Sequence, residues 1–431
     1  MPSESSQDSP PRICYLYTTF PLVSETFLQR EMRVIRSKAV DLELHTIWGG
    51  KTSFEGQPVR RFYLWELIKL VYWLPYWIVK KPTAVGWFFK GLIVHPPRYG
   101  KNWLENLLGF AFALVRAREI EAWNPELVHA VWATMPATAA LTLNKLIGTP
   151  FSMGAHAYDI FQKGGDCFLQ EKLLEARFIH TSTKFAKSHM LQMGADMQKL
   201  RLIRRGLSTF PPLNGMREQI DTIRFLTIGR LVEKKGYIEQ FRIYRDLRKR
   251  GIPFVAEVVG DGPLLKPLTQ LIQDYQLEDQ VKLVGKVAHE NIQSYYQRAD
   301  FFIFTGIVAK NGDRNGLANV IPEAMARGIP VITTPDSGIV ENFQADWEAA
   351  ILPIRPIDDW VMKIKELAAD YDQRKALAAH ARSWVEKSFS APKNSSKLFR
   401  FMKAECSITR AGRGQPAMAE DEPDGEEDDD E

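Results

Sequence analysis

The sequence predicts an α/β protein built from two Rossmann-like, doubly wound domains that face a cleft. The chain has 431 residues, of which 45% are hydrophobic and 25% charged, as is ordinary for a globular chain with two packed domains. Apolar runs of about five to seven residues stop at Gly or Pro and give way to helical patterns, as buried parallel strands do. Because ligands of open α/β sheets bind at the carboxyl ends of the strands, we expect the active site there, in the cleft.

The first domain is predicted over residues 12–210, after a flexible polar leader of residues 1–11. A β-branched and aromatic run at residues 12–20 predicts a strand, and a helical pattern follows with Ser24 as its N-cap. Further strands are expected at residues 40–48, 125–133 and 177–183. Strands that alternate with helices predict a parallel sheet with right-handed crossovers.

The second domain is predicted over residues 221–385, after a Pro/Gly-rich linker at residues 206–221. The chain ends in an acidic block, residues 420–431, that holds ten of the 52 acids and no base, so the remainder carries a net charge of +14. A terminal run of like charges repels itself, and we expect residues 405–431 to form a disordered, solubilising tail. The alternative is a self-masking role, in which the tail covers part of the same chain.

An aromatic and basic insert is predicted at residues 60–118, with ten Lys or Arg residues against two acids, Glu66 and Glu105. Its longest apolar run, residues 70–79, is broken by Pro75 and is too short to span a bilayer. Short helices with aromatic rings beside bases suit the membrane interface, so we expect peripheral membrane contact. The alternative is that these rings pack inside the first domain. Nucleic acid is not expected, because no recognition motif accompanies the charge.

The cysteines and the N-terminus indicate the compartment. Three cysteines, Cys14, Cys167 and Cys406, lie far apart and are odd in number, so they form neither a disulfide framework nor a metal pattern. The polar N-terminus lacks the apolar stretch of a secretory signal. We therefore expect a cytoplasmic protein, peripheral at the cytoplasmic membrane.

Two stretches of the second domain carry side chains suited to a nucleotide. The turn TIGRLVEKKG brings Gly229, Arg230 and Lys235 to the end of a strand, where a guanidinium and an ammonium suit a diphosphate. In NGLANVIPEAMARGIPV, a helix predicted at residues 319–327 turns its first amides toward an anion, and Glu323 could accept hydrogen bonds from a vicinal diol such as a ribose. The alternatives are a solvated basic turn and an acid that caps the helix.

The order and spacing of these motifs resemble the retaining GT-B glycosyltransferases known as glycosyltransferase family 4. The resemblance is carried in the second domain by GRLVEKKG, VVGDGP, VKLVGKV, ADFFIF, GLANVIPEAMARGIPV and TTPDSGIVE. It is carried more loosely in the first domain by FPLVSETFLQRE, HAVWATMPATAA and GAHAYDIF, which are similar to the subgroup that builds exopolysaccharides, including colanic-acid-type transferases. The resemblance also implies a crossover helix, residues 386–404, that returns to the first domain.

The resemblance implies a role for each matching residue. Arg230 and Lys235 would hold the donor diphosphate, Glu323 the ribose, and His156 the donor sugar near its reacting carbon, which makes these four the expected catalytic residues. Acceptor contacts are expected from Ser24 and Glu25. The other expected donor-binding positions are Gly229, Asp159, Val287, Asn315, Gly316, Leu317, Ala318 and Asn319.

One of these positions departs from the family pattern. The residue eight before Glu323 is usually Glu, whereas this chain has Asn315, which keeps hydrogen-bonding capacity but loses the charge. Asp313 could replace the missing acid if its loop bends suitably.

The reaction implied is transfer of a hexosyl unit from a nucleotide-diphosphate sugar to an acceptor hydroxyl, with retained configuration and without a metal or cofactor. The expected acceptor is a glycan or lipid-linked sugar of the cell envelope. A catalytically weakened sugar-binding or assembly subunit at the membrane is the alternative, and a nucleotide-sugar epimerase fits less well.

Overall fold

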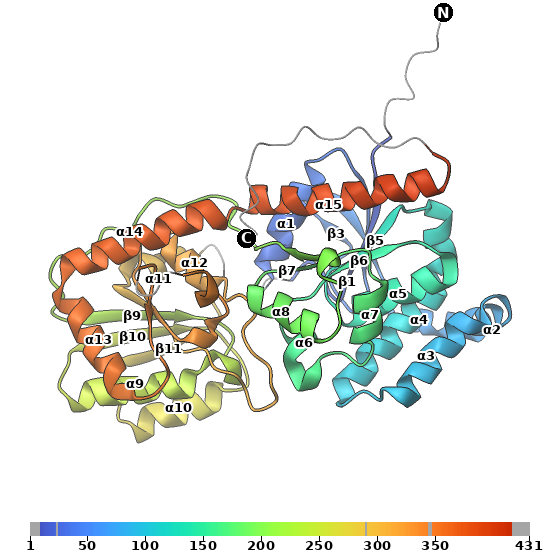
Figure 1. Cartoon of the computed structure of the whole chain (residues 1–431). Coiled ribbons are helices and arrows are strands. Elements are labelled where there is room, and N and C mark those ends of the chain that lie inside the picture. Colours follow the sequence, from blue (N-terminus) through green and yellow to red (C-terminus); the bar gives the residue numbers. More distant parts are fainter. Residues whose placement is uncertain (1–8, 23–24, 289–290, 344–346, 416–431) are drawn as a thin grey trace, which may run out of the picture. The chain divides into compact units, whose positions relative to one another are not determined.

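The computed structural model describes residues 9–22, 25–288, 291–343 and 347–415. The chain divides into two compact units (Figure 1). Met1–Arg204 and Ala391–Glu431 belong to the first unit, and Arg205–Ser390 form the second. Each unit holds a mainly parallel sheet with helices on both faces, so the predicted fold class is confirmed.

The first unit holds an eight-stranded sheet in the order β3-β4-β2-β1-β5-β6-β7-β8, in which only the β3–β4 pair is antiparallel. One face of the sheet packs on α4 and α5, and the other packs on α1 and α15. The strands are β1 (Arg12–Tyr17), β2 (Asp41–Thr46), β3 (Ser53–Phe54), β4 (Gln57–Arg61), β5 (Leu127–Ala130), β6 (Phe151–Gly154), β7 (Ile179–Thr181) and β8 (Leu200–Leu202).

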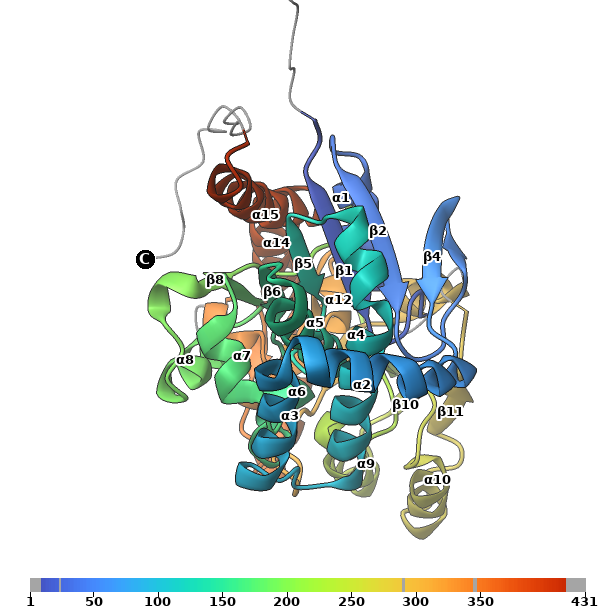
Figure 2. The ribbon, with the colours of Figure 1, turned by 90° about the vertical axis from the view of Figure 1, so that its right-hand side faces the viewer.

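The helices of this unit include a compact group formed by the insert, with η1, α2 and α3 beside the long α4 (Figure 2). They are α1 (Thr26–Arg36), η1 (Leu64–Lys69), α2 (Leu70–Lys80), α3 (Pro82–Val94), α4 (Gly100–Trp123), α5 (Met135–Ile147), α6 (Tyr158–Phe161), η2 (Gln162–Gly164), α7 (Leu169–Glu175), α8 (Lys184–Gln192), η3 (Met197–Lys199) and α15 (Ala391–Gly412). Among the described residues, no helix combines the length and apolar character needed to cross a bilayer.

The second unit holds a six-stranded, fully parallel sheet in the order β11-β10-β9-β12-β13-β14. The helices α9, α10 and α13 cover one face, and α12 and α14 cover the other (Figure 1). The strands are β9 (Ile223–Ile228), β10 (Phe254–Val259), β11 (Val281–Gly285), β12 (Phe301–Phe304), β13 (Val331–Thr333) and β14 (Ala350–Ile351). The helices are η4 (Glu233–Lys235), α9 (Tyr237–Lys249), α10 (Leu265–Asp274), α11 (Gln293–Arg298), α12 (Val320–Met325), η6 (Pro335–Ser337), η7 (Val340–Asn342), α13 (Ile357–Ala369) and α14 (Tyr371–Ser388).

The last helix departs from the prediction. We expected a crossover helix at residues 386–404 and a disordered tail from residue 405, but α14 continues to Ser388 and α15 runs from Ala391 to Gly412. The helix continues because Met402 and Cys406, four residues apart, are buried in the core of the first unit. Arg410 adds an ion pair to Glu126 with an Nε–Oε1 distance of 2.6 Å. Residues 416–431, the remainder of the predicted tail, lie outside the described residues.

Candidate functional site

The basic turn of the second unit begins where β9 ends. Gly229 donates its amide hydrogen to the carbonyl of Val259, with an N–O distance of 2.9 Å, so the turns after β9 and β10 lie against each other. A Cβ atom on Gly260 would lie 1.8 Å from the Gly229 oxygen, which only glycine avoids. The backbone after β9 is thereby fixed, and with it the start of the segment that carries Arg230 and Lys235.

The two adjacent lysines of this turn have different partners. Lys234 Nζ lies 2.9 Å from Asp313 Oδ1 and 3.2 Å from the carbonyl oxygen of Arg314, so its charge is neutralised within the unit. Lys235 is half-buried, and its ammonium lies 4.8 Å from the centre of the Phe304 ring. The site therefore offers the charge of Lys235, rather than that of Lys234, to an anion.

The environment of Lys235 weakens its hold on a proton. Burial, followed by the like charges of Lys234 and Arg230, lowers the pKa of Lys235 from 10.5 to about 7, and Asp313 opposes this shift. Arg230 is exposed, so its guanidinium can meet a ligand from solvent. An arriving anion would favour the charged form of Lys235, which couples anion binding to protonation.

Glu323 lies in the first turn of α12, and Tyr296 of α11 contacts its carboxylate. The Tyr296 hydroxyl donates to Glu323 Oε2 with an O–O distance of 3.2 Å. Arg327 lies over the Tyr296 ring at 4.4 Å and donates through Nη1 to the Glu323 carbonyl at 2.6 Å. Tyr296 carries no local sequence signal for this role, because its ring reaches Glu323 across 27 residues of chain.

Asn315 is buried, and its amide group is a donor to the backbone. Its Nδ2 donates to the carbonyl oxygen of Lys234 at 2.9 Å and to that of Asp336 at 3.4 Å. Its Oδ1 is buried and has no hydrogen-bond partner among the described residues. An ionised Glu has no donor, so it would bring carboxylate oxygens against two carbonyl oxygens. The local backbone therefore favours the amide.

The idea that Asp313 replaces the missing acid is disfavoured by its ion pair with Lys234. A carboxylate engaged in that pair would have to leave it in order to reach a sugar. Asp313 therefore stays paired with Lys234. Asn315 is held by the backbone carbonyl of the same lysine.

The other predicted donor positions of the second unit come from the same edge of the sheet. Gly229 follows β9, Val287 follows β11, and the loop that contains residues 315–319 follows β12. Since these strands are parallel to their neighbours, their carboxyl ends meet at one edge. A Cβ atom on Gly338 would lie 1.5 Å from the Gly316 oxygen, so this loop packs closely on the turn after β13. Leu317 is half-buried, Ala318 is buried, and the buried Asn319 Oδ1 has no hydrogen-bond partner among the described residues.

His156 lies in the loop after β6 of the first unit, and Asp159 lies in the helix α6 that follows it. The buried Asp159 carboxylate accepts hydrogen bonds from the amides of Ala157 at 2.6 Å, His156 at 3.1 Å and Ala133 at 3.3 Å. Burial raises the pKa of Asp159, and these amides oppose the rise. Asp159 therefore holds the loop between β6 and α6 in place. His156 is also buried, with Nδ1 lying 3.3 Å from Ser182 Oγ.

A buried ammonium that no sequence motif indicates supports the loop after β5. Lys172 Nζ lies 2.5 Å from Asp166 Oδ1 and donates to the carbonyl oxygens of Ala133 and Thr134 at 2.8 and 3.2 Å. Asn102 and Asn106 of α4 donate to Asp166 Oδ2 at 2.7 and 2.9 Å. This network ties the insert to the loop that Asp159 also holds.

The predicted acceptor residues are less informative. Ser24 lies outside the described residues. Glu25 directly precedes α1, and its amide donates to the carbonyl of Leu22 at 3.1 Å. Glu25 is therefore located at the start of a helix. Its contact with an acceptor stays a prediction.

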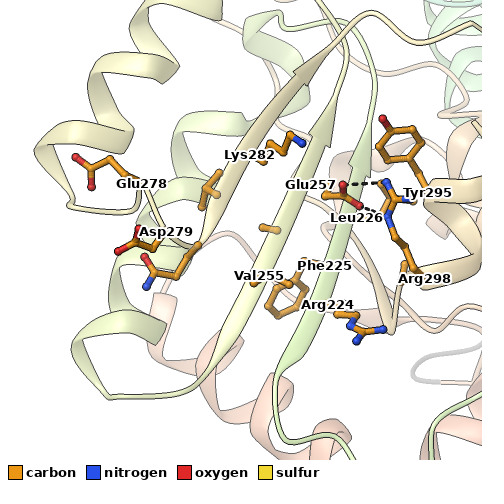
Figure 3. Close-up of a pocket in the computed structure, with 14 residues that line it drawn as sticks. Arg224, Phe225, Leu226, Val255, Glu257, Glu278, Asp279, Lys282, Tyr295 and Arg298 are labelled. Atoms are coloured by element: carbon orange, nitrogen blue, oxygen red, sulfur yellow. Dashed lines mark hydrogen bonds and ion pairs between the residues drawn. The ribbon is translucent and has the colours of Figure 1, made fainter.

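A pocket of about 480 Å³ lies at the opposite edge of the second sheet (Figure 3). It is lined by the first halves of β9 and β10, the start of β11 and the end of α11, and contains none of the predicted donor residues. Arg298 and Glu257 form a two-point ion pair within it, at 2.6 and 2.9 Å, so these charges compensate each other. We do not place the donor in this pocket, because the turns that carry the predicted residues follow the other ends of the strands.

The second unit contains a segment that matches a known protein family. Residues 217–384 match the family model described as glycosyl transferases group 1. This segment contains Arg230, Lys235, Asn315 and Glu323, so these residues belong to a glycosyl transferases group 1 domain.

The chain is 30% identical over 203 residues to the putative colanic acid biosynthesis glycosyltransferase WcaL of Escherichia coli, covering 46% of this chain and 50% of that protein. It is 35% identical over 165 residues to the amylovoran biosynthesis glycosyltransferase AmsK of Erwinia amylovora, covering 38% and 40%. A GDP-mannose-dependent alpha-(1-6)-phosphatidylinositol monomannoside mannosyltransferase of Mycobacterium tuberculosis is 29% identical over 179 residues, covering 41% and 46%. The chain thus spans half or less of the length of these relatives.

Solved structures resemble most of the chain. Anabaena HepE in complex with UDP and glucose has a TM-score of 0.67 at 16% identity and covers 91% of this chain and 100% of that chain. The sucrose-phosphate synthase of Thermosynechococcus elongatus has a TM-score of 0.70 at 13% identity and covers 91% and 98%. These similarities show the GT-B fold.

Proposed function

We propose that the protein is a retaining glycosyltransferase that moves a hexosyl unit from a nucleotide-diphosphate sugar to an acceptor hydroxyl in cell-envelope or exopolysaccharide biosynthesis. The observation that carries this proposal is the position of Arg230, Lys235, Asn315 and Glu323. All four lie in turns and a helix after the carboxyl ends of parallel strands, inside the domain that matches glycosyl transferases group 1.

Arg230 and Lys235 would serve the departing diphosphate. When the bond from the anomeric carbon to the diphosphate oxygen breaks, negative charge grows on the leaving group and positive charge grows on the sugar ring. Cations placed at the leaving group stabilise that transition state. The acceptor oxygen forms the new bond on the same face of the ring, and its proton passes to the departing phosphate oxygen. This scheme needs neither a metal nor a protein base.

Glu323 would bind the ribose of the donor. A carboxylate accepts hydrogen bonds at both oxygens, which matches two neighbouring hydroxyl groups. The hydroxyl of Tyr296 already donates to Oε2 and so orients the group. The HepE structure, whose fold this chain shares, contains UDP and glucose, which supports a nucleotide-sugar donor.

His156 would contact the donor sugar near its reacting carbon. The loop that carries it is fixed by Asp159, and its ring lies 5.6 Å from that of Trp132 and 5.0 Å from that of His180. We assign His156 to the sugar and Asp159 to the shape of the loop.

We further propose a glycan or lipid-linked acceptor and a place at the cytoplasmic membrane. The name of the mycobacterial relative describes transfer to a phosphatidylinositol monomannoside, which is a lipid. Product analysis by mass tests the reaction class: transfer adds a hexose to the acceptor, whereas an epimerase leaves every mass unchanged.

A second candidate is a sugar-binding or assembly subunit with weak catalysis, and Asn315 is the observation that favours it. The amide cannot supply the negative charge that would help a positive sugar ring. Turnover of nucleotide sugars by purified protein separates the candidates, with Lys235→Ala and Glu323→Ala as controls. Transfer that both substitutions abolish supports the enzyme. Thermal shifts with a panel of nucleotide sugars, unaccompanied by transfer, support the binding subunit.

A further inference from the structure

The helices η1, α2 and α3 expose large apolar side chains. Val71 is 81% exposed, Val79 79% and Ile93 80%. More than half of the large apolar side chains that are exposed among the described residues lie between residues 63 and 107. We define the insert surface as the exposed side chains Trp65, Ile68, Val71, Tyr72, Ile78, Val79, Phe89, Ile93 and Val94.

The helix α2 is apolar on two sides, although a helix needs only one apolar side to pack on its own unit. Its inner side holds the buried Trp77, whose Nε1 donates to the Leu114 carbonyl at 2.9 Å, and Trp73 and Leu74 pack beside it. The expectation that the rings of the insert pack inside the first unit is therefore correct for this side of the helix. The outer side holds Val71 and Val79, where a surface helix is usually polar. An apolar outer side on an anchored helix indicates a partner.

The exposed charges of the insert itself are positive. The two acids of the insert are buried: Glu66 pairs with Lys69 at 2.8 Å and with Arg116 at 2.7 Å, and Glu105 lies 3.4 Å from Lys101. Lys80, Lys81, Lys90 and Arg98 are exposed and pair with neither of these acids. Apolar groups beside exposed bases of the same segment complement anionic lipid headgroups.

We propose that the insert surface docks on an anionic phospholipid bilayer. The rings of Trp65 and Tyr72 lie at headgroup depth, aliphatic side chains such as Val71 and Val79 enter the boundary of the acyl chains, and the lysines meet lipid phosphates. The α2 and α3 helices lie at the outside of their own unit in both views (Figures 1 and 2), as docking requires. This docking rests on the membrane location proposed above and names the surface and the lipid charge behind it, whereas lipid binding itself needs no nucleotide sugar.

Two other occupants fit less well. A symmetric contact with a second copy would bring the same patch against itself, and would place Lys80, Lys81 and Lys90 near their own counterparts. Single-stranded nucleic acid needs aromatic stacking platforms along a basic groove, whereas the most exposed side chains here are Val71, Val79 and Ile93.

The test is co-sedimentation of the full-length protein with vesicles of phosphatidylcholine alone or mixed with phosphatidylglycerol, at low and high salt. We expect binding to the anionic vesicles that weakens with salt. The double substitution V71E/V79E should abolish binding. Met362→Glu, on an exposed site of α13 in the second unit, is the matched control and should bind as wild type.

A second series tests the charges. The triple substitution K80Q/K81Q/K90Q should lower partitioning by about fivefold per charge removed. The control K249Q/K266Q/K365Q removes three exposed lysines of the second unit and should leave binding unchanged. The proposal is wrong if the wild type ignores anionic vesicles at low salt, or if the substitutions in the insert behave like their controls.

Further measurements on V71E/V79E distinguish loss of lipid binding from unfolding, from dimer formation and from loss of transfer. Thermal unfolding without lipid should give wild-type values for V71E/V79E, because both side chains are exposed. A wild-type dimer that V71E/V79E converts to a monomer, without vesicle binding by either protein, would assign the surface to a second copy. Transfer to a water-soluble acceptor should survive V71E/V79E, so loss of lipid binding and loss of transfer are separable outcomes.

Discussion

Asn315 Nδ2 donates to the carbonyl oxygen of Lys234 with an N–O distance of 2.9 Å. This hydrogen bond joins the loop after β12 to the basic turn after β9, across 81 residues of chain. The residue that departs from the family pattern therefore stabilises the turn that carries Lys235. An acid at the same position could not make this bond.

Asn315→Glu should destabilise the protein. The substitution removes the amide donor and places a carboxylate beside buried carbonyls, which should cost about 1–3 kcal/mol of the free energy of unfolding. Urea unfolding at neutral pH measures the loss. A Glu variant as stable as wild type, with altered donor preference, would instead show that the amide tunes specificity.

The sequence predicted more of the fold than of the contacts within the site. Buried strand patterns and turn residues gave the two parallel sheets, and they gave the edge at which Lys235 and Glu323 lie, because such signals are local. The bond from Asn315 to Lys234 and the contact of Tyr296 with Glu323 depend on side chains far apart along the chain. The end of α15 was missed because the acidic block at residues 420–431 favoured a tail from residue 405, whereas Cys406 is buried in the core of the first unit.

The pH dependence of transfer should report Lys235. In the free protein the pKa of Lys235 is lowered to about 7, so its ammonium is present below that pH and is lost as the pH rises through it. If the ammonium holds the diphosphate, kcat/KM should fall with rising pH around 7. Lys235→Arg keeps the charge at every accessible pH, and this fall should disappear. An unchanged profile in the Arg variant would assign the titration to another group.

Substitutions of Lys235 and Lys234 should have different effects, the first on catalysis and the second on stability. Lys235→Ala should lower kcat/KM by about 10²–10³, as loss of a donor to a developing anion does, and leave the protein folded. Lys234→Ala should instead lower the unfolding free energy, because Asp313 is left without its ion pair. Steady-state kinetics and thermal unfolding of both variants distinguish these effects. Equal loss of kcat/KM in both, at equal stability, would contradict the division of roles.

Lys172→Met should be the most destabilising of these substitutions. It leaves the buried Asp166 carboxylate without its ammonium, and breaking a buried pair typically costs about 3–5 kcal/mol. Lys145→Met is the control, because the Lys145–Glu175 pair is partly exposed and should contribute less than about 1 kcal/mol. Chemical denaturation of the two variants gives the comparison, and equal losses would refute the structural role of the Lys172 network.

Tyr296→Phe should weaken donor binding without unfolding the site. The ring keeps its packing and its contact with Arg327, while the hydroxyl that donates to Glu323 Oε2 is removed. A single hydrogen bond to a charged group contributes about 1.5–3 kcal/mol. Tyr296 makes this bond in the free protein too, so its loss acts on binding only through the orientation of Glu323, and the Kd for the nucleotide should rise by up to about tenfold. Glu323→Gln should weaken binding as much or more, and the double variant should lose less than the sum of the two effects, since both act on one carboxylate. Additive losses, measured by calorimetric titration of a nucleoside diphosphate, would show that Tyr296 does not act through Glu323.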